Sequence, residues 1–130
     1  MTVRVFGIAY LLVQAAAAAA WWAMLLVRPE SRLPFMAAGA PDSTLLAFGL
    51  ADGLIFVGAS AACGYGFARC RPWAWPLLCV HAGGAGYAAL YCWTLFALIG
   101  DGWLGAALMS PSLAVPGFLV WKLRPLQGAP

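Results

Sequence analysis

The sequence predicts an all-α, polytopic membrane protein whose four transmembrane helices form an antiparallel bundle. Two observations predict this fold class: 65% of the 130 residues are hydrophobic, and only 8% are charged. A soluble domain usually has about a quarter of its residues charged, which keeps its surface in contact with water. So few charges cannot cover a soluble globule. We therefore expect lipid to be the main solvent, and residues 1–130 to form a single membrane domain.

Four apolar segments are long enough to cross a bilayer, because a helix needs about 20 residues to span ~30 Å of hydrocarbon. The predicted helices cover residues 5–27, 44–67, 73–99 and 103–121. The first contains a run of alanines that imitates the end of a signal peptide. Its apolar run continues beyond the alanines and is long enough to span, so a retained helix is expected there.

The connections between these helices follow from charges and helix breakers. Residues 28–43 form the longest connection, an extramembrane loop whose three prolines and four charges stop a helix. Residues 68–73 and 100–102 are short turns. Short turns join antiparallel neighbours, so the second, third and fourth helices are expected to lie side by side. Residues 126–130 are expected to fray.

Basic residues predict the orientation in the membrane. The side that holds both termini carries five of them: Arg4, Arg69, Arg71, Lys122 and Arg124. The other side carries two basic and three acidic residues: Arg28, Arg32, Glu30, Asp42 and Asp101. Cytoplasmic segments carry the excess of Lys and Arg, which places both termini in the cytoplasm, with the bacterial inner membrane as the expected location. An interfacial aromatic belt is expected near the helix ends, from Trp22, Trp73, Trp103 and Trp121.

Asp52 is the residue that lipid should reject most strongly. An aspartate at a helix centre costs roughly 2.5–3.5 kcal/mol, whereas each Leu, Ile, Phe or Val contributes only about 0.3–0.6 kcal/mol. Asp52 is therefore expected to face the bundle, hydrogen-bonded or protonated. Gly49 and Gly53 lie on one helix face beside it, where they would let another backbone approach closely.

Depth along the helices, at ~1.5 Å per residue, predicts two polar layers. The lower layer lies about 10–14 Å from the cytoplasmic ends and contains Gln14, Ser60, His81, Ser110 and Ser112. The upper layer, about 22 Å in, contains Asp52 with the hydroxyl of Tyr87 or Tyr91, or the indole of Trp21. A direct bond between Asp52 and His81 is not expected. Pro111 and Pro116 predict a bend or opening near Ala107 and Ser112.

His81 admits several interpretations. The simplest is a hydrogen bond between helices, to Gln14 or to a serine, with the neighbouring glycines allowing close approach. The alternatives are a proton carrier, or an axial ligand to haem or a chlorophyll-type pigment, for which Met109 is a candidate second ligand. Ionisable groups inside a membrane favour a functional role by default.

Several functional classes are excluded by composition. The net charge of +3 is too weak and scattered for nucleic-acid binding. One histidine and four cysteines without C-x-x-C spacing cannot build a zinc site, and we expect the cysteines to be buried free thiols. No catalytic residue is therefore assigned.

Three functions remain. The first is a small integral membrane subunit, in contact with lipids, that packs against larger membrane proteins or copies of itself and supports assembly of a complex. The second is a binder or carrier of a small hydrophobic ligand: a quinone, lipid, haem or chlorophyll-type pigment. Its pocket would be lined by Asp52, His81, Gln14, Ser60, Tyr87, Tyr91 and Trp21. The third is a membrane enzyme that uses Asp52 or His81 as acid or base.

Overall fold

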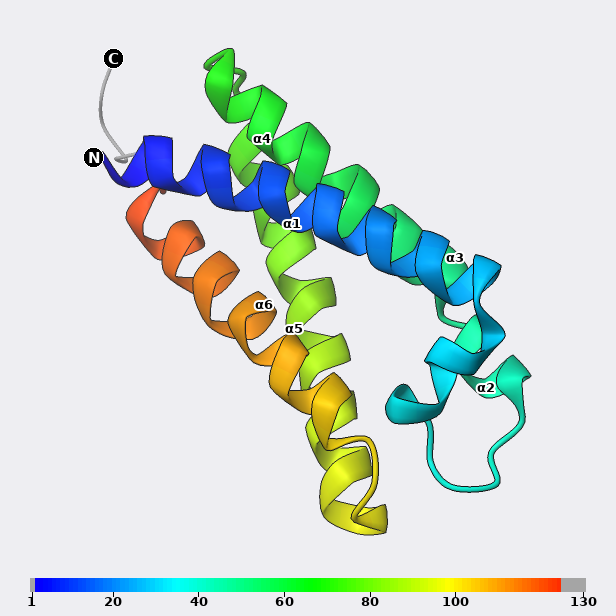
Figure 1. Ribbon diagram of the computed structural model, residues 1–130. Helices are drawn as coiled ribbons and strands as arrows, with labels where there is room; N and C mark the ends of the chain where they lie inside the picture. Colours follow the sequence, from blue (N-terminus) through cyan, green and yellow to red (C-terminus); the bar gives the residue numbers. More distant parts are fainter. Residues whose placement is uncertain (1, 125–130) are drawn as a thin grey trace.

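The computed structural model describes residues 2–124, which contain helices and turns but no strands (Figure 1). The expected fraying of residues 126–130 lies outside the described part. The elements in chain order are α1 (Val3–Val27), the 3₁₀ helix η1 (Pro29–Phe35), α2 (Asp42–Leu46), α3 (Gly49–Asp52), the π-helical segment η2 (Gly53–Ala59), α4 (Ser60–Ala68), α5 (Ala74–Ile99) and α6 (Trp103–Lys122).

Four helical stretches are long and apolar enough to cross a membrane: Val3–Val27, Asp42–Ala68, Ala74–Ile99 and Trp103–Lys122. Their ends fall within two residues of the predicted ends. They contain 25, 27, 26 and 20 residues, which corresponds to about 30–40 Å of helix each. The described residues are therefore all-α, with four helical stretches that are long and apolar enough to cross a membrane, as predicted.

The stretch Asp42–Ala68, called the second span below, is irregular. It consists of α2, α3, η2 and α4 in succession, with a turn at residues 47–48 between α2 and α3. The central part, η2, is π-helical over seven residues and includes Gly53 and Gly58. Glycine carries a high entropic cost in a regular helix, and π segments in other proteins often occur at functional positions.

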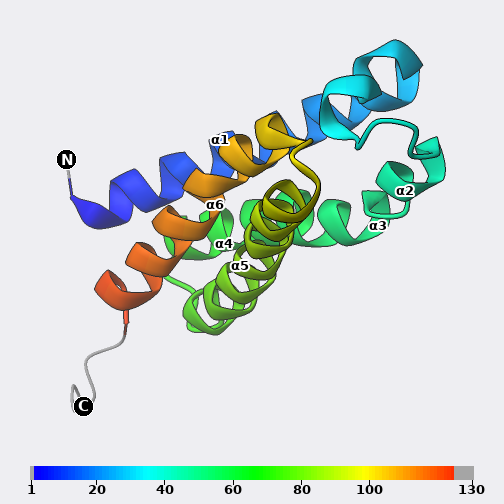
Figure 2. The same ribbon diagram turned by 90° about the horizontal axis from the view of Figure 1, so that it is seen from below.

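The four spans pack mainly as neighbours in sequence. α1 lies along η2 and α4, and α5 lies along α6 and also contacts η2 and α4 (Figures 1 and 2). α5 is therefore placed between the second span and α6. The contact between α1 and α6 is smaller and includes the Leu119 side chain, which comes within 3.0 Å of the position that a Cβ on Gly7 would occupy.

One fully buried cluster ties the spans together. Its members are one residue from each span: Leu11, Cys63, Leu78 and Leu119. The partly buried side chains around it include Tyr10, Phe67, Leu77 and Val115. Small residues line the rest of the interior, including Ala85 and Ala89 on α5 and Ala106 on α6. Such residues let helices approach closely in lipid, where apolar burial alone does not drive association.

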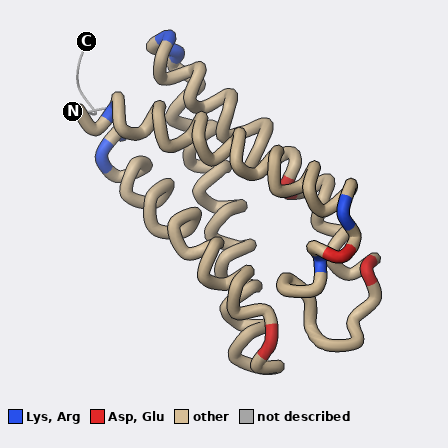
Figure 3. The backbone as a smooth tube through the Cα atoms, in the orientation of Figure 1, with Lys and Arg blue, Asp and Glu red and all other residues tan. Residues whose placement is uncertain are grey.

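Apart from Asp52, the charged residues of the described part of the chain lie near the ends of the helices or in the connections between them (Figure 3). At one end, the Arg4 Nε donates to the carbonyl oxygen of Phe67 at 3.1 Å, and its Nη2 donates to the Cys70 thiol at 2.7 Å. At another end, Arg32 Nε donates to the Leu25 carbonyl at 2.8 Å, and its guanidinium forms an ion pair with Asp42. Residues 28–43 are thus not simply a solvated loop, because η1 is helical and buries Arg32 against the end of α1.

The aromatic belt is composed differently from the prediction. Trp73, Trp103 and Trp121 are exposed near helix ends, as a belt requires. Trp22 was wrongly included, because it is only 8% exposed. Its ring packs on Gly49, 3.2 Å from where a Cβ would be, and so faces the second span instead of the lipid.

α6 is continuous through both prolines, so the predicted opening of this helix is not found. Pro111 lacks the N–H that would bond the carbonyl four residues earlier. Neighbouring side chains bond the backbone in this region. Ser110 Oγ donates to the Ala106 carbonyl at 3.0 Å, and the Tyr10 hydroxyl donates to the Pro111 carbonyl at 3.1 Å. Both bonds go to carbonyls other than those of Ala107 and Ser112, which lose their helical N–H donors to Pro111 and Pro116.

Candidate functional site

The polar side chains inside the spans form separate groups, each at a contact between two helices. The largest is centred on His81, which is fully buried on α5. Its Nδ1 lies 3.0 Å from the Ile55 carbonyl oxygen. A carbonyl only accepts, so Nδ1 carries the proton in this bond. Ser60 Oγ lies 3.4 Å from Nε2, and the Phe56 ring packs edge-on to the imidazole at 6.2 Å between centroids.

This geometry explains why a histidine occurs here. Ile55 belongs to the π-helical segment η2, where the backbone bonding pattern shifts from i+4 towards i+5 and regular pairing is disturbed. His81 supplies a donor to one carbonyl of that segment from the neighbouring helix. The expected hydrogen bond to a serine is present, with Ser60, whereas Gln14 bonds elsewhere.

The three glycines that follow His81 have different surroundings. A Cβ on Gly84 would lie 3.1 Å from the Ile55 side chain, so this glycine makes room for the residue that His81 contacts. A Cβ on Gly86 would meet Leu113 of α6 at 3.5 Å. Gly83 has no atom within 4 Å of its Cβ position and faces outward. Only Gly84 and Gly86 therefore serve packing inside the described bundle.

Asp52 forms the second group, with a partner other than those predicted. Trp22 Nε1 donates to Asp52 Oδ2 at 3.3 Å. Trp21 instead packs edge-on against Phe35 at 5.2 Å, and its own Nε1 is buried without a partner within residues 2–124. Trp21, one of the alternatives suggested for this partner, was wrong: the two adjacent side chains point about 100° apart on the helix, and Trp22 is the one that faces the second span.

The predicted tyrosine partners of Asp52 lie elsewhere. Tyr91 is 39% exposed and its ring packs near Phe48, with 5.4 Å between centroids. Tyr87 is 73% exposed on the outer side of α5. Neither hydroxyl makes a hydrogen bond to Asp52 in the described part of the chain. The upper polar layer is therefore a Trp22–Asp52 pair.

The third group joins α1 to α6. Gln14 Nε2 donates to Ser112 Oγ at 3.1 Å, one turn from the Tyr10 bond to Pro111. Gln14 Oε1 is buried without a partner among the described residues. Ser110 is not part of this contact, because its Oγ accepts from Trp93 Nε1 at 3.1 Å. The predicted lower layer is thus divided between two helix contacts, Gln14–Ser112 and Ser60–His81.

The arrangement limits what these groups can bind. Within residues 2–124, no three His, Cys, Asp or Glu side chains lie together as metal ligands. The His81 ring contacts the second span, whereas Met109, the suggested second axial ligand, lies on α6. Because His81 is fully buried and bonded, a haem or chlorophyll-type pigment would have to displace these contacts. Asp52 and His81 bond to different partners, as expected.

The cysteines are free thiols in the structure. Cys63 is fully buried, as predicted for all four, whereas Cys79 and Cys92 are half-buried. Cys70 departs from the prediction: it is exposed in the turn after α4, where its backbone φ is 52°.

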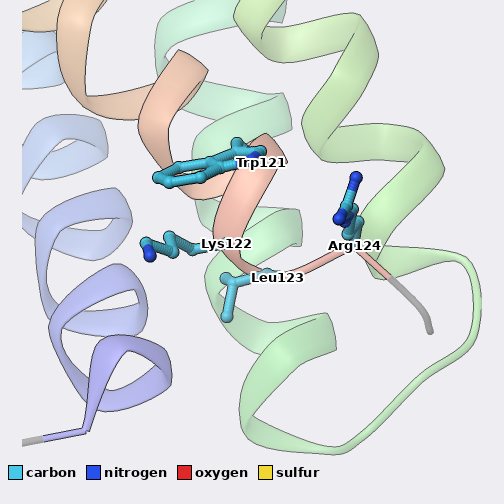
Figure 4. Close-up of a pocket in the computed structure, with 4 residues that line it drawn as sticks. All are labelled: Trp121, Lys122, Leu123 and Arg124. Atoms are coloured by element: carbon cyan, nitrogen blue, oxygen red, sulfur yellow. The ribbon is translucent and has the colours of Figure 1, made fainter.

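A surface pocket at the end of α6 is lined by Trp121, Lys122, Leu123 and Arg124 (Figure 4). The Lys122 ammonium lies 4.0 Å from the centre of the Trp121 ring. Figure 4 shows the Lys122 and Arg124 side chains pointing to different sides of the chain. The two cations therefore do not converge on one anion.

Comparison with known proteins gives no match to a protein-family model, to a curated protein or to a solved structure. The function has to be inferred from this chain's own contacts. Two contributors to them were missed from the sequence: Trp22 and the Ile55 carbonyl. Trp22 lies on the buried stripe of α1, seven residues after Ala15 and eleven after Leu11, but hydropathy does not determine the rotation of α1 that turns this stripe inward. Nothing in the sequence marks the Ile55 carbonyl.

Proposed function

We propose that this chain is a small integral membrane subunit that packs against larger membrane proteins and supports assembly of a membrane complex. The observation that supports it is the use of the intramembrane polar groups. Asp52 bonds to Trp22, Gln14 to Ser112, and His81 to the Ile55 carbonyl. Each bond joins two helices of the same bundle. The polar side chains that could perform chemistry are thus used to hold the helices together. The outer faces of the helices are the surfaces that remain for contacts with partner proteins.

The test is purification of a tagged chain from its native membrane in mild detergent, followed by quantitative mass spectrometry. A discrete set of membrane proteins at near-equal amounts is the expected result. An unrelated four-helix membrane protein with the same tag serves as the control for proteins that bind any detergent-solubilised bundle. Recovery of the chain without any protein partner would overturn the proposal.

We further propose that the bundle is antiparallel, with both termini in the cytoplasm and the bacterial inner membrane as its location. The Arg4 contact with Phe67 brings the start of α1 to the end of the second span, which supports this topology. The exposed Cys70 thiol provides a direct test. A membrane-impermeant maleimide should label it only from the cytoplasmic side. A cysteine introduced at Gly39, in the 28–43 connection, should be labelled only from the other side; the reverse pattern would refute the orientation.

A second candidate, a carrier of a small hydrophobic ligand, is favoured by one observation. Gln14 Oε1 and Trp21 Nε1 are buried without partners in the described structure, and they lie two turns apart on α1, about 10 Å along the axis. A quinol-type ligand could donate to the first, and a quinone carbonyl could accept from the second. Lipid extraction with mass spectrometry, together with a visible spectrum for pigment, tests this function. A colourless preparation without a bound quinone would count against it.

An enzyme that works through Asp52 or His81 ranks below both. The two side chains bond to different groups, and His81 is fully buried. An activity that survives both Asp52→Asn and His81→Gln would exclude this role.

A further inference from the structure

α5 has an outer face that none of the other described helices covers. Its exposed residues recur every three or four positions: Val80, Gly83, Tyr87, Leu90, Tyr91 and Thr94, which together we call the α5 outer face. The opposite side of the same helix carries His81, Ala85 and Ala89, all fully buried. α5 therefore presents one side to the bundle and one side to the membrane.

Tyr87 is out of place on a face that contacts lipid. It follows the first residue of α5 by 13 positions and precedes the last by 12, so it lies about 18–20 Å from either end of the helix. This is the middle of a hydrocarbon layer ~30 Å thick. Its side chain is 73% exposed, and its hydroxyl has no hydrogen-bond partner within residues 2–124. Acyl chains offer no partner, and the ring is too short to reach the interface where tyrosine is normally found.

Gly83 lies one turn before Tyr87 and leaves an open notch. No atom lies within 4 Å of its Cβ position. Helical side chains lean towards the N-terminal end of their helix, so the Tyr87 ring lies at the level of Gly83. A second copy of this chain has the same charge distribution and therefore the same orientation in the membrane. In that copy the notch at Gly83 is at the depth of the first copy's Tyr87 ring.

We propose that the α5 outer face is a homodimer interface, in which α5 of two copies pack in parallel. Each Tyr87 ring sits over Gly83 of the other copy, and the two hydroxyls bond near the membrane centre. A two-fold contact of this kind is self-complementary, since residue 87 meets residue 83 twice. A second copy of the chain has a hydroxyl that can bond the Tyr87 hydroxyl and a notch that can accept the Tyr87 ring, both at the required depth in the membrane. The inference deepens the proposed function by naming one partner, and it rests on that proposal for the role of the dimer in assembly.

The experiment measures Förster transfer between two fluorescent fusions of the full chain in phosphatidylethanolamine–phosphatidylglycerol vesicles, over a range of protein-to-lipid ratios. Wild-type chain is expected to show saturable transfer. Gly83→Leu fills the notch and should abolish it. Tyr87→Phe keeps the ring but removes the hydroxyl, and should weaken dimerisation about threefold, as expected for one hydrogen bond between membrane helices.

The matched control is Gly117→Leu on α6, another exposed glycine with no atom within 4 Å of its Cβ position. It should leave transfer unchanged. Because the added side chain starts in open space at both positions, both variants should keep the helical circular-dichroism spectrum of the wild type, which shows that they fold. Absence of saturable transfer in the wild type, or transfer that survives Gly83→Leu, overturns the inference.

The two proposals fail separately. A monomeric chain that co-purifies with other membrane proteins removes the dimer and leaves the proposed subunit function standing. A dimer lost on Gly83→Leu, in a chain that brings down no other protein, supports the dimer and refutes the proposed role in a larger complex.

Discussion

The second span and α5 are packed neighbours of nearly equal length, 27 and 26 residues, yet their backbones differ. α5 is one unbroken α-helix from Ala74 to Ile99. The second span is interrupted by a turn and by the π-helical segment η2. Both contain several glycines, so glycine content alone does not explain the difference.

The difference lies in what the neighbouring helices supply. The Ile55 carbonyl in η2 receives the His81 N–H from α5, and Asp52, directly before η2, receives the Trp22 N–H from α1. Irregular backbone is tolerated at membrane depth only where other protein groups satisfy it. α5 is regular and provides a donor to the backbone of η2, whereas the donor from α1 bonds the Asp52 side chain next to it. Four substitutions test this explanation, in order of decreasing expected effect.

The largest effect is expected from Gly64→Leu in α4, the regular end of the second span. A Cβ at this position would lie 2.9 Å from two carbons of Leu12 on α1, and 3.6 Å from the Ile8 carbonyl oxygen. Overpacking of this kind should lower the free energy of unfolding by about 2–3 kcal/mol. Chemical unfolding in detergent micelles measures it. Gly117→Leu is the control, and equal stability of the two variants would contradict close packing between α1 and α4.

The second largest loss of stability is expected from His81→Leu. This substitution fills the site with an apolar side chain but removes the N–H that donates to the Ile55 carbonyl. Leaving a buried carbonyl without its partner should cost about 1–3 kcal/mol. Hydrogen exchange should accelerate in η2 and stay unchanged in most of α5. His81→Gln, which retains a donor, should lose less. A uniform acceleration along both helices would show that η2 does not depend specifically on this bond.

Trp22→Phe tests the Asp52 contact with a smaller expected effect. The substitution removes the N–H together with the pyrrole part of a buried indole, so the cost should be the loss of packing plus about 0.6–1.7 kcal/mol for a hydrogen bond between membrane helices. The adjacent residue is a built-in control, since the Trp21 N–H has no partner in residues 2–124. Trp21→Phe removes the same atoms but breaks no hydrogen bond, so it should lower the unfolding temperature less than Trp22→Phe does. The opposite ranking of the two variants would reassign the partner of Asp52.

The smallest expected effect is a gain in stability. Gly53→Ala adds a methyl group at the start of η2, where no atom lies within 4 Å of the Cβ position. Reduced freedom of the unfolded chain should stabilise the protein by about 0.4–1 kcal/mol. Thermal unfolding measures the gain. A loss of stability instead would mean that η2 needs the conformational freedom of glycine at this position.

Much of the fold follows from the sequence because the bilayer fixes helix length. The four spans were predicted within two residues at each end, and the inward position of Asp52 followed from the cost of its charge in lipid. The partners were harder to predict. Choosing between Trp21 and Trp22 requires the rotation of α1, which hydropathy leaves undetermined. The π-helical character of η2 involves His81, 26 positions away in the chain, so local sequence does not reveal it. The buried Arg32 was missed for a similar reason, because its main partners belong to α1 and α2.

The Trp22–Asp52 bond has a consequence for biosynthesis. If the second span left the translocon alone, it would carry the Asp52 carboxyl group into hydrocarbon. The free-energy cost would equal the insertion free energy that several leucines contribute. The ribosome makes the tryptophan 30 positions before the aspartate, so the donor is already in the membrane when the acid arrives. The first two helices should therefore insert as a pair.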